Sequence, residues 1–156
     1  MSTVIESINF AELDACHQQM KLHLTNLEAL ALAFEARGSD AQVKAQAQVI
    51  ESFFSGAARK HHQQEETEVF PVLLAQGHPE LADLILTLKQ DHGWIEENWI
   101  ELAPQLRAIA SGNFWFEASE FQHGVEVFLD LCRNHMGLEE TRVYPQVIGL
   151  LGSAKA

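Results

Sequence analysis

The sequence predicts an all-α protein, an up-down-up-down antiparallel four-helix bundle, from three observations. Apolar and polar residues rarely alternate at the two-residue period of a β-strand, and Ala, Leu, Glu and Gln dominate. Strands are therefore not expected. Helix-breaking stretches fall at 37–40, 76–80 and 111–114 and divide the chain into four long segments. Each segment carries inward-type residues spaced alternately by three and four, the pattern of a bundle interior. Short links between such helices make neighbours antiparallel.

The predicted elements belong to a single domain spanning residues 1–156. The four helices are expected at residues 9–37, 40–77, 79–110 and 114–150. Asp40 suits the N-cap of the second helix, and Pro79 suits the first turn of the third. The first, second and third helices are expected to end at glycines, namely Gly38, Gly77 and Gly112.

A histidine interrupts each apolar stripe. In the second segment the stripe runs Val43, Ala47, Ile50, Phe54, Ala57, His61, Glu65, Val69 and Val72. The histidines of the four stripes, in chain order, are His17, His61, His92 and His135. Counted from the helix ends, these residues lie at matched heights, with a mismatch on the order of 5 Å or less at 1.5 Å per residue. The sequence therefore predicts one layer of histidines across the bundle.

Composition excludes several classes of function. The formal charge of −12 disfavours nucleic acid and anionic membranes as partners, since both attract basic surfaces. No apolar run approaches the roughly 18 residues that span a bilayer, and the start "MSTVIESINF" lacks the features of a signal peptide. A cytoplasmic location is therefore expected. Cys16 and Cys132 are too few for a disulfide scaffold and are expected to remain reduced.

Two stretches of the chain repeat one motif. "HHQQEETEVFP" covers residues 61–71, and "NHMGLEETRVYP" covers residues 134–145. Both contain H-x-x-x-E-E-T-x-V-aromatic-P, at an offset of 74 residues, and His17 and His92 are offset by 75. These offsets predict an internal duplication of a helical hairpin. In each copy the proline is expected to bend the end of the helix, while Phe70 and Tyr144 close the core.

The glutamate four residues after the histidine of each copy shares the inward face of its helix. Glu65 and Glu139 would then lie beside the four histidines. Burying four imidazoles and two carboxylates without partners is unfavourable. A set of four nitrogen and two carboxylate donors suits two five- or six-coordinate ions of Fe, Mn or Zn, bridged by the carboxylates and with room for an outside ligand. Histidines that simply hydrogen-bond to core glutamates are the alternative.

The same helical phase leaves other polar residues of the motif outside the layer. His62 and Glu66 lie one residue out of phase with His61 and Glu65, a rotation of about 100°. Together with the remaining acidic residues of the motif, they are predicted to be solvated surface residues: His62, Glu66, Glu68 and Glu140.

From about His17 to Pro145, the chain resembles the hemerythrin-like (HHE cation-binding) domains. The resemblance rests on His17, the two repeated motifs and "DH92". It implies a non-haem di-iron centre with an oxo or hydroxo bridge, for which Mn or Zn could substitute. The four layer histidines would be terminal ligands, and Glu65 and Glu139 would bridge.

Two positions depart from the oxygen-carrying hemerythrins. Those proteins place a further histidine one turn after the helix-three histidine, where this chain has Glu96. They also have an aspartate after the last histidine, where this chain has Glu139 and Glu140. Reversible oxygen carriage is therefore not the expected role. Glu96 could be a third carboxylate ligand, an acceptor for an imidazole N–H, or a residue of the helix flank.

Three functions fit these features. The first is binding of O2, NO or a peroxide at the di-iron centre, in a sensing, scavenging or redox role. The second is repair of iron–sulfur or di-iron centres under nitrosative or oxidative stress, known for family members with an extra N-terminal cysteine-containing segment; in this chain 16 residues precede His17. The third is a peroxidase or NO-reductase enzyme, with Glu96 or Glu140 as the proton source. The expected partner is a small diatomic ligand or a peroxide.

Overall fold

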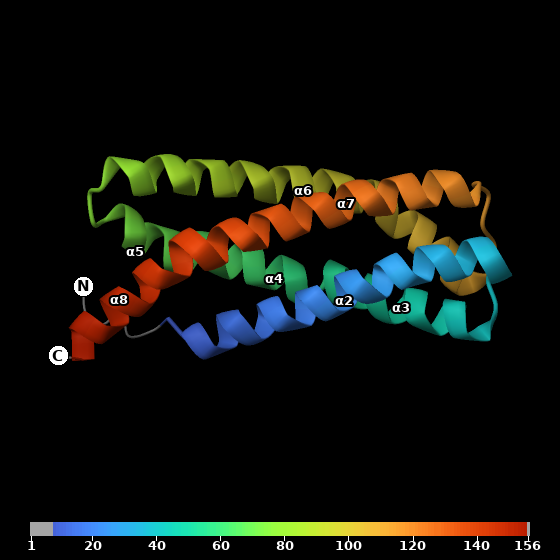
Figure 1. Cartoon of the computed structure of the whole chain (residues 1–156), viewed down its shortest axis with the longest axis horizontal. Helices are drawn as coiled ribbons and strands as arrows, with labels where there is room; N and C mark the ends of the chain where they lie inside the picture. The colour runs from blue at the N-terminus through green and yellow to red at the C-terminus, as the bar shows by residue number, and fades with distance from the viewer. Residues whose placement is uncertain (1–7, 156) are drawn as a thin grey trace.

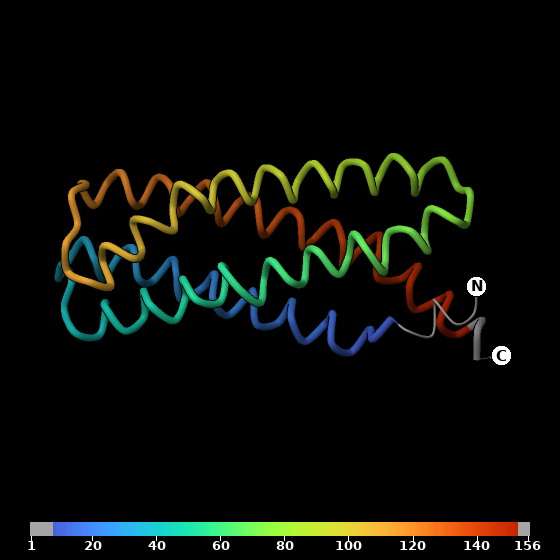
Figure 2. The backbone as a smooth tube through the Cα atoms, turned by 180° about the vertical axis from the view of Figure 1, so that it is seen from behind, coloured from blue at the N-terminus to red at the C-terminus, as the bar shows by residue number. Residues whose placement is uncertain are grey.

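The all-α prediction is confirmed. The computed structural model describes residues 8–155 of the chain, and every regular element within that range is helical. Figure 1 shows long helical stretches lying side by side, with the chain reversing direction at the turns between them. The view from behind in Figure 2 shows the same arrangement. In these described residues, no helix is long and apolar enough to cross a membrane.

The first and third stretches are single helices, α2 (Phe10–Arg37) and α6 (Pro79–Ser111). The second and fourth stretches are each built from several pieces. The second comprises α3 (Ala41–Ser55), α4 (Ala57–Gln64), η1 (Glu65–Val69) and α5 (Phe70–Leu74). The fourth comprises α7 (Ala118–Leu138), η2 (Glu139–Val143) and α8 (Tyr144–Lys155). Because α2 and α6 each pack against both α3 and α7, the four stretches surround one interior.

The predicted turn residues occupy their expected places. The Asp40 carboxylate accepts a hydrogen bond of 2.8 Å from the backbone N–H of Val43, which caps α3. Pro79 is the first residue of α6. The three turn glycines have φ values of 67°, 74° and 79°, in the left-handed region that residues with a Cβ avoid: Gly38, Gly77 and Gly112.

The second stretch is not the continuous helix that the sequence predicted. Gly56, with φ −116° and ψ −86°, separates α3 from α4, and its N–H bonds to the carbonyls of Ser52 and Phe53. Ala58, four residues after Phe54, is buried, whereas Ala57, the predicted stripe residue, is exposed. His61 and Glu65 keep their inward positions because the spacing from Ala58 onward is again three and four.

Each copy of the repeated motif ends in one turn of π-helix. In η1 the N–H of Phe70 bonds to the carbonyl of Glu65, five residues earlier, and in η2 Tyr144 bonds to Glu139 in the same way. Pro71 and Pro145 follow at once; a proline has no N–H to donate, and its ring crowds the carbonyl four residues before. The motif threonine also donates to a carbonyl of the preceding turn, which bends helices. The sequence predicted a bend here, and the bend takes the form of a wide turn beginning at the buried glutamate.

The apolar interior is divided into two clusters. One cluster includes Leu24, Ile50, Trp99 and Phe128, and lies toward the turns at 38–40 and 112–117. The other includes Leu13, Phe70, Leu88 and Val143, and lies toward the turn at 75–78. Each layer histidine falls in sequence between residues of the two clusters. The polar layer is therefore shielded from water at both ends by packed hydrocarbon.

Candidate metal centre

The six predicted ligand residues come together in the interior between the two apolar clusters. Each histidine comes from a different helix: α2, α4, α6 and α7. The two glutamates are the first residues of η1 and η2. None of the six residues is more than 6% exposed: His17, His61, Glu65, His92, His135 and Glu139. The layer expected from the helical heights is therefore present.

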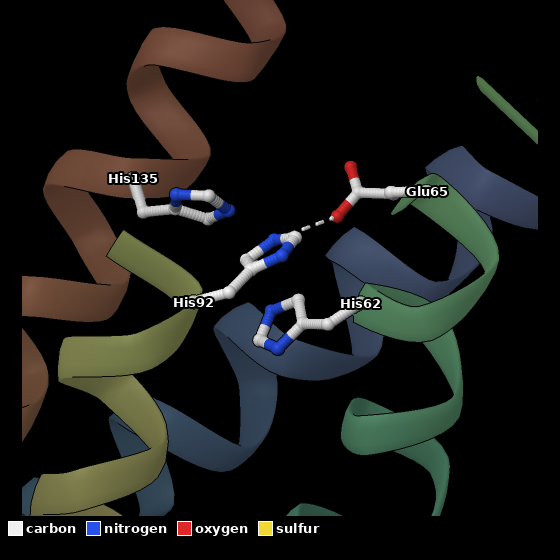
Figure 3. Close-up of side chains that lie close together, drawn as sticks. All are labelled: His62, Glu65, His92 and His135. Carbon is white, nitrogen blue, oxygen red and sulfur yellow. Dashed lines mark ion pairs between the residues drawn. The ribbon is translucent and has the colours of Figure 1, made fainter. Parts of the chain in front are cut away.

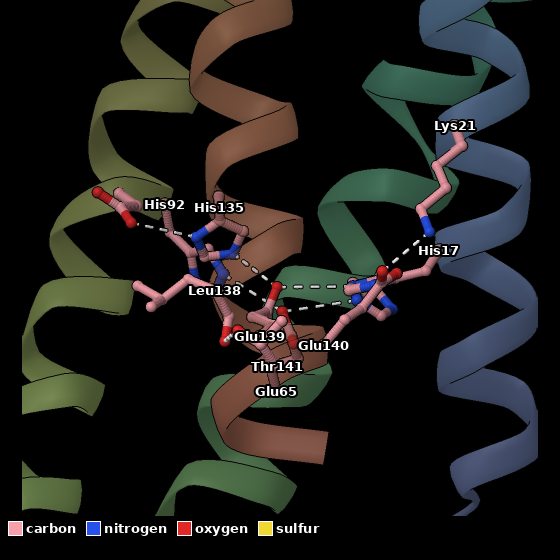
Figure 4. A network of polar contacts seen from close by, with 11 residues as sticks. His17, Lys21, Glu65, His92, His135, Leu138, Glu139, Glu140 and Thr141 are labelled. Carbon is pink, nitrogen blue, oxygen red and sulfur yellow. Dashed lines mark hydrogen bonds and ion pairs between the residues drawn. The ribbon is translucent and has the colours of Figure 1, made fainter. Parts of the chain in front are cut away.

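The Nε2 atom of each layer histidine faces a buried carboxylate oxygen, and Figure 4 shows His17, His92 and His135 around the two glutamates. The distances to the facing Oε1 atoms are 3.5 Å for His17–Glu139, 3.5 Å for His61–Glu65, 3.3 Å for His92–Glu65 and 2.8 Å for His135–Glu139. None of these pairs is aligned as a hydrogen bond, so four Nε2 atoms and four carboxylate oxygens are buried without a hydrogen-bond partner. Leaving one such group unsatisfied costs about 1–3 kcal/mol. Cations bound among these atoms would satisfy all of them, so the donor set fits a metal site.

The opposite ring nitrogen, Nδ1, contacts a carboxylate in three of the four histidines. These contacts are His17 with Glu140 at 3.0 Å, His92 with Glu66 at 2.8 Å and His135 with Asp91 at 3.4 Å. A carboxylate beside Nδ1 favours the tautomer that carries its proton there, which leaves the lone pair of Nε2 pointing into the layer. Ligand histidines in metalloproteins are oriented in this way.

These contacts correct the prediction that Glu66 and Glu140 are solvated surface residues. Both are half-buried, and each crosses to a histidine of the other half of the chain. Glu140 also pairs with Lys21, whose Nζ lies 2.9 Å from its Oε1 atom. The sequence named Asp91 only within the motif "DH92" and predicted no contact for it. The E-E doublet in both copies of the motif is the signal that could have identified the two glutamates.

In the metal-free layer, burial disfavours the charged form of two histidines and one glutamate. Burial, and to a lesser extent the neighbouring histidines, lower the pKa of His61 to about 3 and that of His135 to about 2. Burial also raises the pKa of the Glu65 carboxyl. For His92, burial acts to lower the pKa, but the carboxylates of Glu65 and Glu66 outweigh it and raise the pKa. Neutral imidazoles are the form that binds metal, and a nearby cation would favour ionised Glu65.

His62 is not the solvated residue that the sequence predicted. It is half-buried, and its ring stacks on that of His92 with centroids 4.2 Å apart. The helical phase placed His62 about 100° from the inward face, but the long imidazole reaches back toward the layer from the flank of α4. Figure 3 shows it gathered with Glu65, His92 and His135.

Glu96 lies on the helix flank, one of the three places considered for it. Arg59 donates from Nε to the Oε2 atom of Glu96 at 3.1 Å, and its NH2 group pairs with the other carboxylate oxygen. Both side chains are about two-fifths exposed. In this structure Glu96 therefore faces an arginine at the surface and does not contact a layer histidine.

The remaining residues singled out by the sequence have structural roles. Phe70 and Tyr144 are buried, as predicted, and each packs against a layer histidine of the other half: His92 at 5.9 Å and His17 at 4.8 Å between ring centroids. Cys16 and Cys132 are free thiols. Burial raises the pKa of both, to about 11 for Cys16, so the thiols stay protonated and weakly reactive.

A helical interior that gathers buried imidazoles and carboxylates, with outer carboxylates orienting the rings, defines a metal-binding protein of the histidine–carboxylate class. The family model of the hemerythrin HHE cation-binding domain matches residues 9–147. The chain belongs to this family. It is also 31% identical over 126 residues to a protein of Haemophilus influenzae described as uncharacterized, a match that covers 81% of this chain and 71% of that protein. No solved structure matches the chain.

Proposed function

We propose that this protein is a cytoplasmic, hemerythrin-like, non-haem di-iron protein that binds O2, NO or a peroxide. We also infer that its four helical stretches form an up-down-up-down antiparallel bundle, which holds the ligand layer at mid-height. The observation that carries the proposal is the set of buried Nε2 and carboxylate oxygen atoms without hydrogen-bond partners. Imidazole and carboxylate donors without thiolate suit iron, with manganese or zinc as substitutes.

The chain itself supplies binding, orientation and exclusion of water. His17, His61, His92 and His135 would hold the ions through Nε2, and Glu65 and Glu139 through their carboxylates. Glu66, Asp91 and Glu140 orient three of the rings through Nδ1. When bound, a pair of iron ions supplies the redox and ligand-binding chemistry that these side chains lack.

A small cavity beside the layer limits the size of the molecule that can bind there. The cavity holds about 20 Å³ and is lined by His62 together with Trp99, Phe128 and Cys132, among others. A cavity needs about 10–15 Å³ on this measure to hold one water molecule. The space therefore suits a diatomic molecule or a similarly small ligand. Most of the lining side chains are apolar, which favours O2 and NO over charged species, and the paired Arg59 and Glu96 also line it.

Metal analysis and optical spectroscopy test the proposal. The protein is purified without oxygen, loaded with Fe²⁺, and its iron content is measured after gel filtration. Exposure to air is expected to produce the absorption of a bridged di-ferric centre, and O2, NO, azide and peroxide are then compared as ligands. His61→Ala and His135→Ala are expected to lose iron. The exposed His123 supplies the matched control, His123→Ala, which is expected to retain it.

Fewer than one tightly bound ion per chain, with no further loss in His61→Ala or His135→Ala, would reject the proposal. Steady-state consumption of NO or peroxide by the reduced protein separates turnover from binding. A single stoichiometric reaction is expected for a binding protein, whereas continued consumption would identify an enzyme.

A further inference from the structure

His62 is the histidine near the layer that the repeated motif does not account for. Its ring stacks on His92 with an interplanar angle of 25° and meets His135 edge-on, with centroids 5.6 Å apart. It also lines the small cavity, so it lies between that cavity and the layer. A half-buried imidazole in this place is in reach of the same ions as its neighbours.

The potential donor atoms form two groups, in each of which all atoms lie within 4.8 Å of one another. The first group is His62, Glu65, His92 and His135; the second is His17, His61, Glu65 and Glu139. Without His62, the first group would keep two imidazoles and a carboxylate that it shares with the second. With His62, each group offers four donors.

The duplication gives an internal reference for this residue. At the offset of 74 residues, His62 corresponds to Met136, a buried core residue that belongs to neither donor group. The other parts of the layer repeat: His61 with His135, Glu65 with Glu139, and Glu66 with Glu140. His62 is therefore a departure from the repeat that adds a nitrogen donor to one side of the layer.

We propose that His62 is a seventh protein ligand of the centre, binding the ion held by His92, His135 and Glu65. This assignment rests on the proposed di-metal function and refines it. The two ion positions are then chemically unlike: one has three imidazoles and a carboxylate, the other two imidazoles and two carboxylates. Imidazole-rich sites favour Fe, Zn, Cu and Ni, while carboxylate-rich sites also accept Mn. The two positions consequently differ in affinity and metal preference.

The test uses Zn²⁺ and Fe²⁺ as probes of the whole chain. Metal-free protein with ¹⁵N-labelled histidine is titrated with Zn²⁺, and the ring nitrogens are followed by NMR. A ring nitrogen of His62 is expected to shift with those of His92 and His135, while the exposed His123 stays unchanged. In parallel, Fe²⁺ affinity is measured without oxygen by competition with a chelator. His62→Met, which copies the other half of the chain, is compared with His123→Met as the matched control.

His62→Met is expected to bind one ion as tightly as the wild type and the second about 10–100-fold more weakly. Losses of this size are typical even when a residue that only hydrogen-bonds to a metal ligand is removed. Two outcomes would overturn the assignment while leaving the proposed function intact. One is that His62→Met binds both ions with the same affinities as the wild type, and the other is that the His62 nitrogens do not shift at full Zn²⁺ loading. Failure of the wild type to bind metal would overturn the proposed function itself. The NMR arm needs no variant, so it decides the assignment even if His62→Met folds poorly.

Discussion

The two halves of the chain build the same site with different parts. In both halves a histidine, a buried glutamate, a π-helical turn and a proline follow one another at the same spacing. The halves differ at the flank of the layer. The first half has His62 where the second has Met136, and the second has Asp91 where the first has Cys16. The repeat thus preserves the inner histidine and glutamate of each copy, while the flanking residues would make the two proposed ion positions unequal.

The largest expected effect is a difference in iron content between variants of the two buried glutamates, Glu65 and Glu139. Glu65 belongs to both donor groups, whereas Glu139 belongs to one. Glu65→Gln is therefore expected to reduce bound iron from about two ions per chain to fewer than one, because metal sites need the deprotonated carboxylate. Glu139→Gln is expected to retain about one ion. Metal analysis after gel filtration measures both, and equal losses would show that the two glutamates have equivalent roles.

A smaller loss is expected when the outer carboxylates are removed. Glu66→Ala and Glu140→Ala each leave one imidazole without its Nδ1 partner, which typically weakens metal affinity about 10–100-fold. Glu68→Ala is the matched control, since Glu68 lies in η1 and contacts Gln64, outside the layer. Chelator competition provides the affinities. The comparison fails if Glu68→Ala weakens binding as much as Glu66→Ala does.

The pH dependence of the metal-free protein should contrast His61 with His92. The pKa of His61 is lowered in the fold to about 3. Below about pH 6.5 the imidazole is therefore protonated in the unfolded chain but stays neutral in the folded chain. Its contribution to stability is therefore lost as the pH falls below about 6.5, at up to about 1.4 kcal/mol per pH unit. His92, with a raised pKa, has the opposite sign and loses its contribution as the pH rises above about 6.5.

Urea unfolding in the presence of a chelator, between pH 5 and 8, measures both effects. His61→Leu is expected to flatten the stability profile on the acid side, and His92→Leu to flatten it on the alkaline side. The same change in slope for both variants would contradict the opposite signs expected for the two histidines.

The smallest expected effect concerns the aromatic residue before each proline. The Tyr144 hydroxyl is buried and has no hydrogen-bond partner within the described residues, whereas Phe70 stands at the matching place in the first half. Tyr144→Phe is therefore expected to raise the free energy of unfolding of the metal-free protein by about 1 kcal/mol. Phe70→Tyr should lower it by a similar amount or more. Thermal and urea unfolding measure both, and destabilisation by Tyr144→Phe would reveal a partner for the hydroxyl.

The inner layer could be predicted from sequence because the buried residues of each helix recur every three or four positions. His17, His61, His92 and His135 interrupt apolar stripes, and the spacing of four then indicates Glu65 and Glu139. The break at Gly56 was not predicted, since a single glycine within a helical pattern is usually tolerated. The π turns were foreseen only as bends, because the bonding shift from four to five residues leaves the sequence pattern unchanged.

The residues that support the layer were missed for a geometric reason. His62, Glu66 and Glu140 lie on helix flanks, where a rotation of about 100° separates them from the inward face. Whether a long side chain at such a position turns outward or inward depends on the neighbouring helix, which the periodicity of its own helix does not describe. Glu96 shows the opposite outcome, since Arg59 draws it to the surface.

The contacts between the halves are reciprocal. Glu66 and Phe70 of the first half contact His92 of the second, and Glu140 and Tyr144 of the second contact His17 of the first. Such an exchange, in which each unit offers its partner what it receives, is the rule of an isologous two-fold interface. In the language of assemblies, the chain is a dimer of hairpins joined by the turn at 75–78. Joining the two units in one chain is what allows them to differ, as an exact homodimer could not place a histidine at one position and a methionine at its symmetry mate.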